Sequence, residues 1–135
     1  MNDVLLNKAA IIERCLKRIQ EEYRGFEQEL KTNYTKQDAI LLNIQKACEA
    51  TIDMAAHIVR LHSLGVPQSS RDIFVLLENA QIISSDLSNK LQMMVGFRNI
   101  AVHHYTVLDL DVVRSIIEKE LTVFLEFNRC LLQKT

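Results

Sequence analysis

The polar side chains best suited to chemistry are gathered in one short stretch of the chain. Residues 96–105 read GFRNIAVHHY and hold an arginine, an asparagine, two histidines and a tyrosine. Arginine carries a permanent charge on a planar fork of donors that matches phosphate oxygens, and histidine can give or take a proton near neutral pH. This set of side chains is therefore suited to binding a phosphate group and moving a proton beside it.

Spacing indicates which of these side chains could act together if the stretch is helical, with about 100° of rotation per residue. Arg98 and Tyr105 are seven residues apart, so they share one face. Asn99 and His103 are four apart, which lets the amide bind one imidazole nitrogen and fix its tautomer. Arg98 and His103 are separated by about 140° on an ideal helix. Their convergence needs a long arginine reach, an irregular helix start near Gly96, or a second subunit.

The same residues also have a purely structural interpretation, which residue types alone favour. Arg98 and Asn99 could cap a helix, and residues 103–105 could form a half-buried helix end, because clustered polar groups are often structural. Spacing does not decide between the two interpretations. We expect Arg98→Ala and His103→Ala to leave the protein folded, because neither residue belongs to the main apolar stripes of the predicted helices.

Outside this stretch, Asp53 and His57 are four residues apart, where a carboxylate and an imidazole can pair on one helix face. They are either a second layer of support for the polar stretch or a hydrogen-bonded pair within the bundle. We expect no metal site, because the histidines and carboxylates form neither a His-Glu-x-x-His pattern nor a Cys-x-x-Cys pair. The histidines considered are His57, His62, His103 and His104.

The composition excludes several classes of protein. With 3 glycines and 1 proline among 135 residues, the chain should have few turns and long helices. We expect a single domain over residues 1–135, because domains commonly have about 100 to 150 residues.

A net charge of −1 excludes nucleic-acid binding by bulk charge, so any RNA binding needs a local positive patch. The chain lacks a membrane-spanning apolar run and a signal-peptide pattern, which predicts a cytoplasmic protein.

Apolar spacing predicts two long helices in the first half of the chain. The first carries apolar residues three and four apart over residues 5–30. The second begins at a cap on Thr35, with Asp38 completing a capping-box-like pattern, and runs toward Leu64. Gly65 then ends it, because glycine readily adopts the left-handed conformation of a helix C-cap.

Three more helices are predicted in the second half. A serine in each of the pairs 69–70 and 84–85 caps a helix, the second of these helices closes at Gly96, and Asp109 caps the last one. Period-two alternation is absent, so the fold class is all-α, an up-down bundle of four main helices with short additional helices. The cysteines at positions 15, 48 and 130 lie among apolar helical residues, which predicts reduced thiols rather than disulfides.

The box at residues 96–105 resembles the Arg-x4-His-x-Tyr signature of HepT-like toxins, a branch of the HEPN superfamily of small α-helical proteins. Arg-x4-His is a short pattern by itself, but the ten-residue box inside an all-helical chain of this length is specific. The likeness extends along most of the chain, through Asp38, Asn43, Asp53, His57, Gly65-Val66-Pro67, Arg71-Asp72 and Phe74.

The resemblance implies a metal-independent endoribonuclease, the toxin of a type VII HEPN/MNT toxin–antitoxin system, with no cofactor. Arg98 would bind the scissile phosphate, and His103 would act as general base or acid on the ribose 2′-hydroxyl or the leaving oxygen. The expected product is a 2′,3′-cyclic phosphate. Asn99 would orient His103, while Asp53 and His57 would support the site.

The resemblance also implies regulation and partners. Tyr105 matches the position that an MntA-type nucleotidyltransferase antitoxin modifies with AMP, which would place negative charge on the helix face of Arg98 and repel RNA. His104 either helps to bind RNA or only faces solvent. The expected partners are RNA, with tRNA the expected substrate, the nucleotidyltransferase, and a second copy of the chain. The resulting homodimer could assemble further with the antitoxin into a larger hetero-oligomer.

Two alternatives stay open. One is a non-catalytic helical module that binds a nucleotide or docks the nucleotidyltransferase, because fold alone does not settle function. The other is a histidine phosphotransfer bundle, which fits less well because the surroundings of His103 resemble the HepT box. Losing RNA cleavage but not complex formation on changing Arg98 or His103 would separate the nuclease from the binding module.

Overall fold

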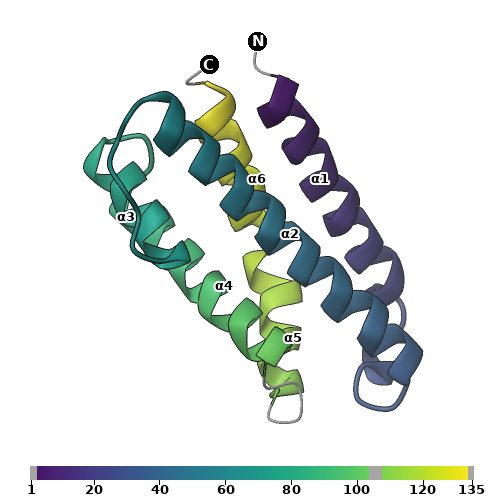
Figure 1. Cartoon of the computed structure of the whole chain (residues 1–135). Coiled ribbons are helices and arrows are strands. Elements are labelled where there is room, and N and C mark those ends of the chain that lie inside the picture. The colour runs from purple at the N-terminus through teal and green to yellow at the C-terminus, as the bar shows by residue number, and fades with distance from the viewer. Residues whose placement is uncertain (1–2, 104–107, 134–135) are drawn as a thin grey trace.

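The computed structural model of the protein describes residues 3–103 and 108–133, with only the backbone of residues 102 and 103. Every regular element in these two ranges is helical, which confirms the all-α prediction. Figure 1 shows a bundle in which α1 and α2 lie side by side, with α4 and the α5–α6 run completing it. The elements in order are α1 (Asp3–Tyr23), the 3₁₀ turn η1 (Glu27–Glu29), α2 (Tyr34–Leu61), α3 (Ser70–Asn79), α4 (Ser85–His103), α5 (Leu110–Ser115), the π-helical segment η3 (Ile116–Glu120) and α6 (Leu121–Leu132).

The first helix ends earlier than its apolar stripe predicts. α1 stops at Tyr23, and Gly25 follows with φ of +83°, a left-handed conformation that glycine adopts at little steric cost. Leu30 is fully buried although it lies outside the helix, whereas Phe26 is exposed. The prediction of one helix over residues 5–30 was wrong because a side chain after the turn packs on the same core and prolongs the pattern.

The second helix begins and ends at different residues from those predicted. Its cap is Asn33, whose Oδ1 accepts a hydrogen bond from the Lys36 backbone N–H at 3.1 Å, so Thr35 lies inside the first turn. The helix ends at Leu61 and not near Leu64. Both differences arise because several residues near each end can satisfy the free backbone groups of a helix.

The caps of the later helices are as predicted. The hydroxyl of Ser69 accepts from the Asp72 N–H at the start of α3, and the hydroxyl of Ser84 accepts from the Leu87 N–H at the start of α4. The Asp109 carboxylate accepts from the Asp111 N–H and so caps α5.

The fourth helix does not close at Gly96. α4 continues without interruption through this residue to His103, so the polar stretch begins inside a helix and not after one. A glycine in a helix interior costs about 1 kcal/mol relative to alanine, which weakens a helix but does not end it. The angles between side chains that helical spacing predicts therefore apply to residues 98–103.

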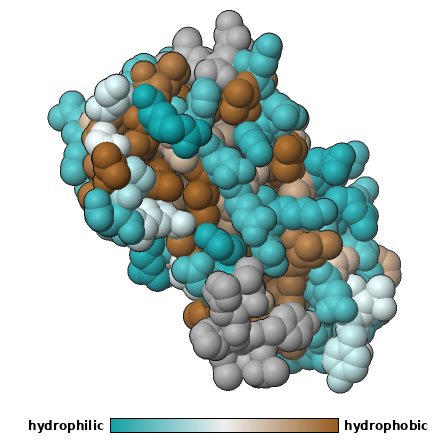
Figure 2. Space-filling model, in the orientation of Figure 1, coloured by the Kyte–Doolittle hydropathy of each residue, from teal (hydrophilic) through white to brown (hydrophobic). Residues whose placement is uncertain are grey.

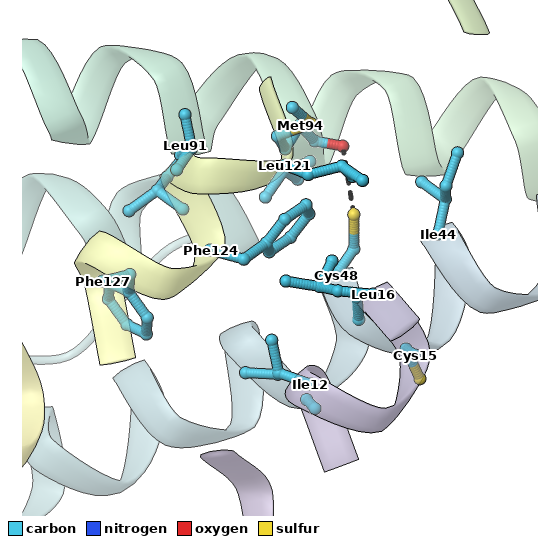
Figure 3. Close-up of a cluster of buried hydrophobic side chains, with 14 of the residues drawn as sticks. Ile12, Cys15, Leu16, Ile44, Cys48, Leu91, Met94, Leu121, Phe124 and Phe127 are labelled. Atoms are coloured by element: carbon cyan, nitrogen blue, oxygen red, sulfur yellow. Dashed lines mark hydrogen bonds between the residues drawn. The ribbon is translucent and has the colours of Figure 1, made fainter. Parts of the chain in front are cut away.

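The core is filled by apolar side chains from all of the α-helices and from η3. In Figure 3, Ile12, Leu16, Phe124 and Met94 surround Cys48, whose thiol donates to the Met94 carbonyl oxygen at a sulfur–oxygen distance of 3.8 Å. The three cysteines are free, as predicted. In the part of the chain that the structure describes, no helix is both long and apolar enough to cross a membrane.

A polar cluster fastens the π-helical segment to the end of α1. The Tyr23 hydroxyl donates to the Glu118 carboxylate in η3 and accepts a hydrogen bond from Arg114 Nη1 at 2.9 Å. Burial, followed by the bond to Glu118, raises the pKa of Tyr23. This cluster holds the α5–α6 run against α1.

Candidate functional site

The buried side of α4 leads directly to Arg98. Leu87, Leu91 and Met94 are buried at spacings of four and three residues, and Arg98 follows Met94 by four. Residues with this spacing share one face of a helix. Arg98 therefore extends the apolar stripe of α4, and the prediction that it lies off the main stripes was wrong, because α4 continues past Gly96.

The Arg98 guanidinium lies in a partly desolvated position beside α2. Burial raises the pKa of the Cys48 thiol to about 12, and the nearby positive charge of Arg98 acts in the opposite direction. The Nε atom of Arg98 is buried and has no hydrogen-bond partner in the described structure. A buried donor without a partner is unusual in proteins, and a charged donor of this kind is suited to an anionic ligand.

The opposite side of α4 faces solvent. Asn99 and Ile100 are exposed, and the position of His103 follows Asn99 by one turn. The helical register separates Arg98 from His103 by about 140°. The regular helix thus removes one of the three predicted routes to convergence, the irregular start near Gly96. His104 and Tyr105 lie outside the described residues, as does the side chain of His103.

The structure does not bring Asp53 to Arg98 within one chain. The Asp53 carboxylate binds the Lys8 ammonium group at 3.1 Å, so it connects α2 to α1. Cys48 contacts α4 through the Met94 carbonyl oxygen, and Asp53 lies five residues further along α2, about 140° around the helix from Cys48. His57 follows Asp53 by one turn and is half-buried. The supporting role of Asp53 and His57 stays a prediction.

No metal-binding cluster is present in residues 3–103 and 108–133, where no group of three His, Cys, Asp or Glu side chains could hold an ion. In the part of the polar stretch whose side chains the structure describes, residues 96–101, the chemically active groups are the Arg98 guanidinium and the Asn99 amide. The imidazole groups belong to His103 and His104, the adjoining positions of the same stretch.

A largely apolar groove runs along one flank of α4, and sequence reasoning did not identify it. Its volume is about 240 Å³, and it lies between α4 and the α5–η3 segment. Met93 is 71% exposed and Val112 is 46% exposed at this groove, beside the buried Phe97. The spacing of Met93, Phe97 and Ile100 could have indicated an apolar face at this groove. Apolar residues three and four apart on a helix are usually interpreted as core residues. Figure 2 shows hydrophobic groups scattered over a mainly hydrophilic surface.

Comparison with known proteins gives consistent matches over nearly the whole chain. A family model described as ribonuclease HepT-like matches residues 12–131. The mRNA nuclease HepT of Shewanella oneidensis is 50% identical over 127 residues, which cover 94% of this chain and 95% of that protein.

Solved structures match equally well. A tri-AMPylated HEPN toxin of Shewanella oneidensis in complex with its MNT antitoxin superposes with a TM-score of 0.93 and 46% identity, covering 100% of both chains. A toxin–antitoxin complex with AMP-PNP superposes with a TM-score of 0.93 and 47% identity, covering 97% of this chain and 99% of that chain. The matched regions include all of α4.

Proposed function

Because the chain belongs to the ribonuclease HepT-like family of HEPN proteins, we propose that it is a toxin that cleaves RNA without a metal ion, using Arg98 and His103. The observation that carries this proposal is the Arg98 guanidinium, which is half-buried with an unpaired Nε–H on the helix that also carries His103. An enzyme that handles phosphate needs a charged donor already removed from bulk water.

The proposed reaction uses the ribose 2′-hydroxyl as an internal nucleophile. One imidazole takes the proton of this hydroxyl, and the 2′ oxygen then forms a bond to phosphorus. The bond from phosphorus to the 5′ oxygen breaks, and a protonated imidazole gives that oxygen its proton. The products are a 2′,3′-cyclic phosphate and a 5′-hydroxyl end. Arg98 stabilises the negative charge that grows on the phosphate oxygens, an effect worth about 3 kcal/mol for one well-placed donor.

A second copy of the chain completes the site in this proposal. Arg98 and His103 diverge by about 140° on one helix, so residues from two chains can meet more readily than those from one. The apolar groove beside Met93 and Phe97 adjoins the polar stretch and supports the burial of this surface between two chains. Two copies also supply the acid and the base, one imidazole from each.

The activity is proposed to be switched off by AMPylation of Tyr105. The matched Shewanella oneidensis toxin is tri-AMPylated and bound to an MNT antitoxin. Each added AMP brings a phosphate, which would pair with Arg98 and repel the phosphates of RNA. Asn99 is proposed to orient His103, and His104 to contribute to RNA binding.

Two classes of RNA are candidates for the substrate. The family resemblance implies tRNA, whereas the Shewanella oneidensis relative is named an mRNA nuclease. The test offers both to the purified protein, with Tyr105 verified as unmodified by mass spectrometry. Total tRNA and a transcribed mRNA are incubated separately in EDTA, and the new ends are examined for cyclic phosphate.

The matched variants are Arg98→Ala, His103→Ala and, as a control, His62→Ala in the exposed turn after α2. We expect chelator-resistant cleavage by the parent and by His62→Ala, and none by the other two. Intact RNA of both kinds at high protein concentration would contradict the nuclease proposal and favour the binding module. Cleavage by Arg98→Ala at the parent's rate would remove the role given to Arg98.

A further inference from the structure

A second arginine, Arg71, lies against α4 at Gly96. A Cβ atom on Gly96 would clash with Arg71 Nη2 and would lie 3.4 Å from Arg71 Cζ, so the guanidinium occupies the space that a side chain would fill. Arg71 belongs to the first turn of α3, which packs beside α4 (Figure 1). Glycine is less favourable than alanine inside a helix, and at this position its lack of a side chain leaves room for the arginine to approach the helix.

The donors of Arg71 are not used within the described structure. The side chain is exposed, and none of the described residues forms a hydrogen bond or an ion pair with it. The neighbouring carboxylate of Asp72 accepts from the Gln68 backbone N–H at 2.9 Å. An exposed guanidinium whose donors are not used within the protein is able to bind an oxyanion through two parallel hydrogen bonds.

The position of Arg71 relates directly to the polar stretch. Gly96 and His103 are seven residues apart, which places them on the same face of α4 at a separation of about 10 Å along the helix. Asn99 lies between them on this face and is exposed. Residues 87–103 contain no Asp or Glu, so no carboxylate on this part of α4 opposes an approaching phosphate.

We propose that Arg71 is a second phosphate-binding residue of the RNA site, seated on Gly96 and contacting a backbone phosphate near the one at His103. This inference rests on the proposed ribonuclease function. A chain with a net charge of −1 needs a local positive patch to bind RNA, and Arg71 would form part of that patch. Arg98 supplies charge on the buried side of α4, and Arg71 supplies it on the exposed side that carries His103.

The test measures binding separately from cleavage. In a His103→Ala background, the anisotropy of a fluorescein-labelled, 12-nucleotide single-stranded RNA of mixed sequence is followed at several salt concentrations. The variants are Arg71→Gln and Arg71→Lys, with Arg60→Gln as a control of equal charge change in the last turn of α2. We expect Arg71→Gln to weaken binding about three- to tenfold and to reduce the salt slope by about 0.7. Arg71→Lys retains part of the affinity, and Arg60→Gln retains all of it.

Gly96→Ala provides a second, independent variant. The new methyl group would displace the Arg71 guanidinium, so RNA binding should weaken although alanine favours the helix. In the active protein, Arg71→Gln should raise KM with little change in kcat, whereas Arg98→Ala should abolish kcat. Equal affinity and salt slope for Arg71→Gln and the parent would overturn the role of Arg71 and leave the nuclease proposal intact. A parent that binds no RNA at low salt would overturn both.

Discussion

Replacing Arg98 with methionine should make the protein more stable while it destroys the proposed site. Arg98 continues the buried stripe of α4, and its Nε–H is buried without a partner. An unsatisfied buried donor costs about 1 to 3 kcal/mol, and the lower end applies because the side chain is only half-buried. Methionine keeps the flexible apolar stem and removes the unmet donor. We expect a gain of about 1 kcal/mol, or about 4 °C in the midpoint of thermal unfolding for a chain of this size.

The assay is thermal and urea unfolding of the unmodified parent and the Arg98→Met variant, followed by circular dichroism. Lys46→Met is the control, because it removes a charge from an exposed position of α2 and should change stability by less than about 0.5 kcal/mol. A midpoint below that of the parent would refute the reasoning, since Arg98 would then contribute to folding through a partner. Loss of RNA cleavage alongside the higher midpoint is the expected combination, because functional residues often reduce stability.

Three other predictions concern the fold. Asn33→Ala should destabilise the protein by about 1 kcal/mol by removing the α2 cap, whereas Thr35→Ala should have less than half that effect in urea unfolding. The folded-state pKa of Cys48 is raised to about 12 from 9.0, so its contribution to stability is complete below pH 9 and is lost as pH rises toward 12. The unfolding free energy of the parent should therefore fall more steeply over this range than that of Cys48→Ala, and parallel curves would contradict the assignment. Tyr23→Phe should cost about 1 to 2 kcal/mol by leaving the Glu118 carboxylate without its donor, and an unchanged midpoint would show that this bond contributes nothing.

The helix boundaries show where local pattern and tertiary packing diverge. The Asp109 cap, and a serine cap within each of the pairs 69–70 and 84–85, could be predicted because a cap is a contact between residues two or three apart. The end of α1 could not be predicted in this way. Leu30 is buried by packing in the bundle core, so its position in the sequence continues the apolar spacing of the helix beyond Tyr23. The predicted end of α4 at Gly96 was wrong for a similar reason. The low helix propensity of glycine is outweighed there by the packing of the residues on either side.

Residue types and their spacing are enough to predict the all-helical class, the free cysteines and the stretch of polar residues on which the proposed chemistry rests. These properties depend on residue type and short-range spacing, which are present before the chain folds. The half-buried position of Arg98 near Cys48, the ion pair between Asp53 and Lys8, and the contact of Arg71 with Gly96 depend on how the helices pack. Each of these contacts joins two helices, and the separation of helices in space cannot be read from the spacing within one of them.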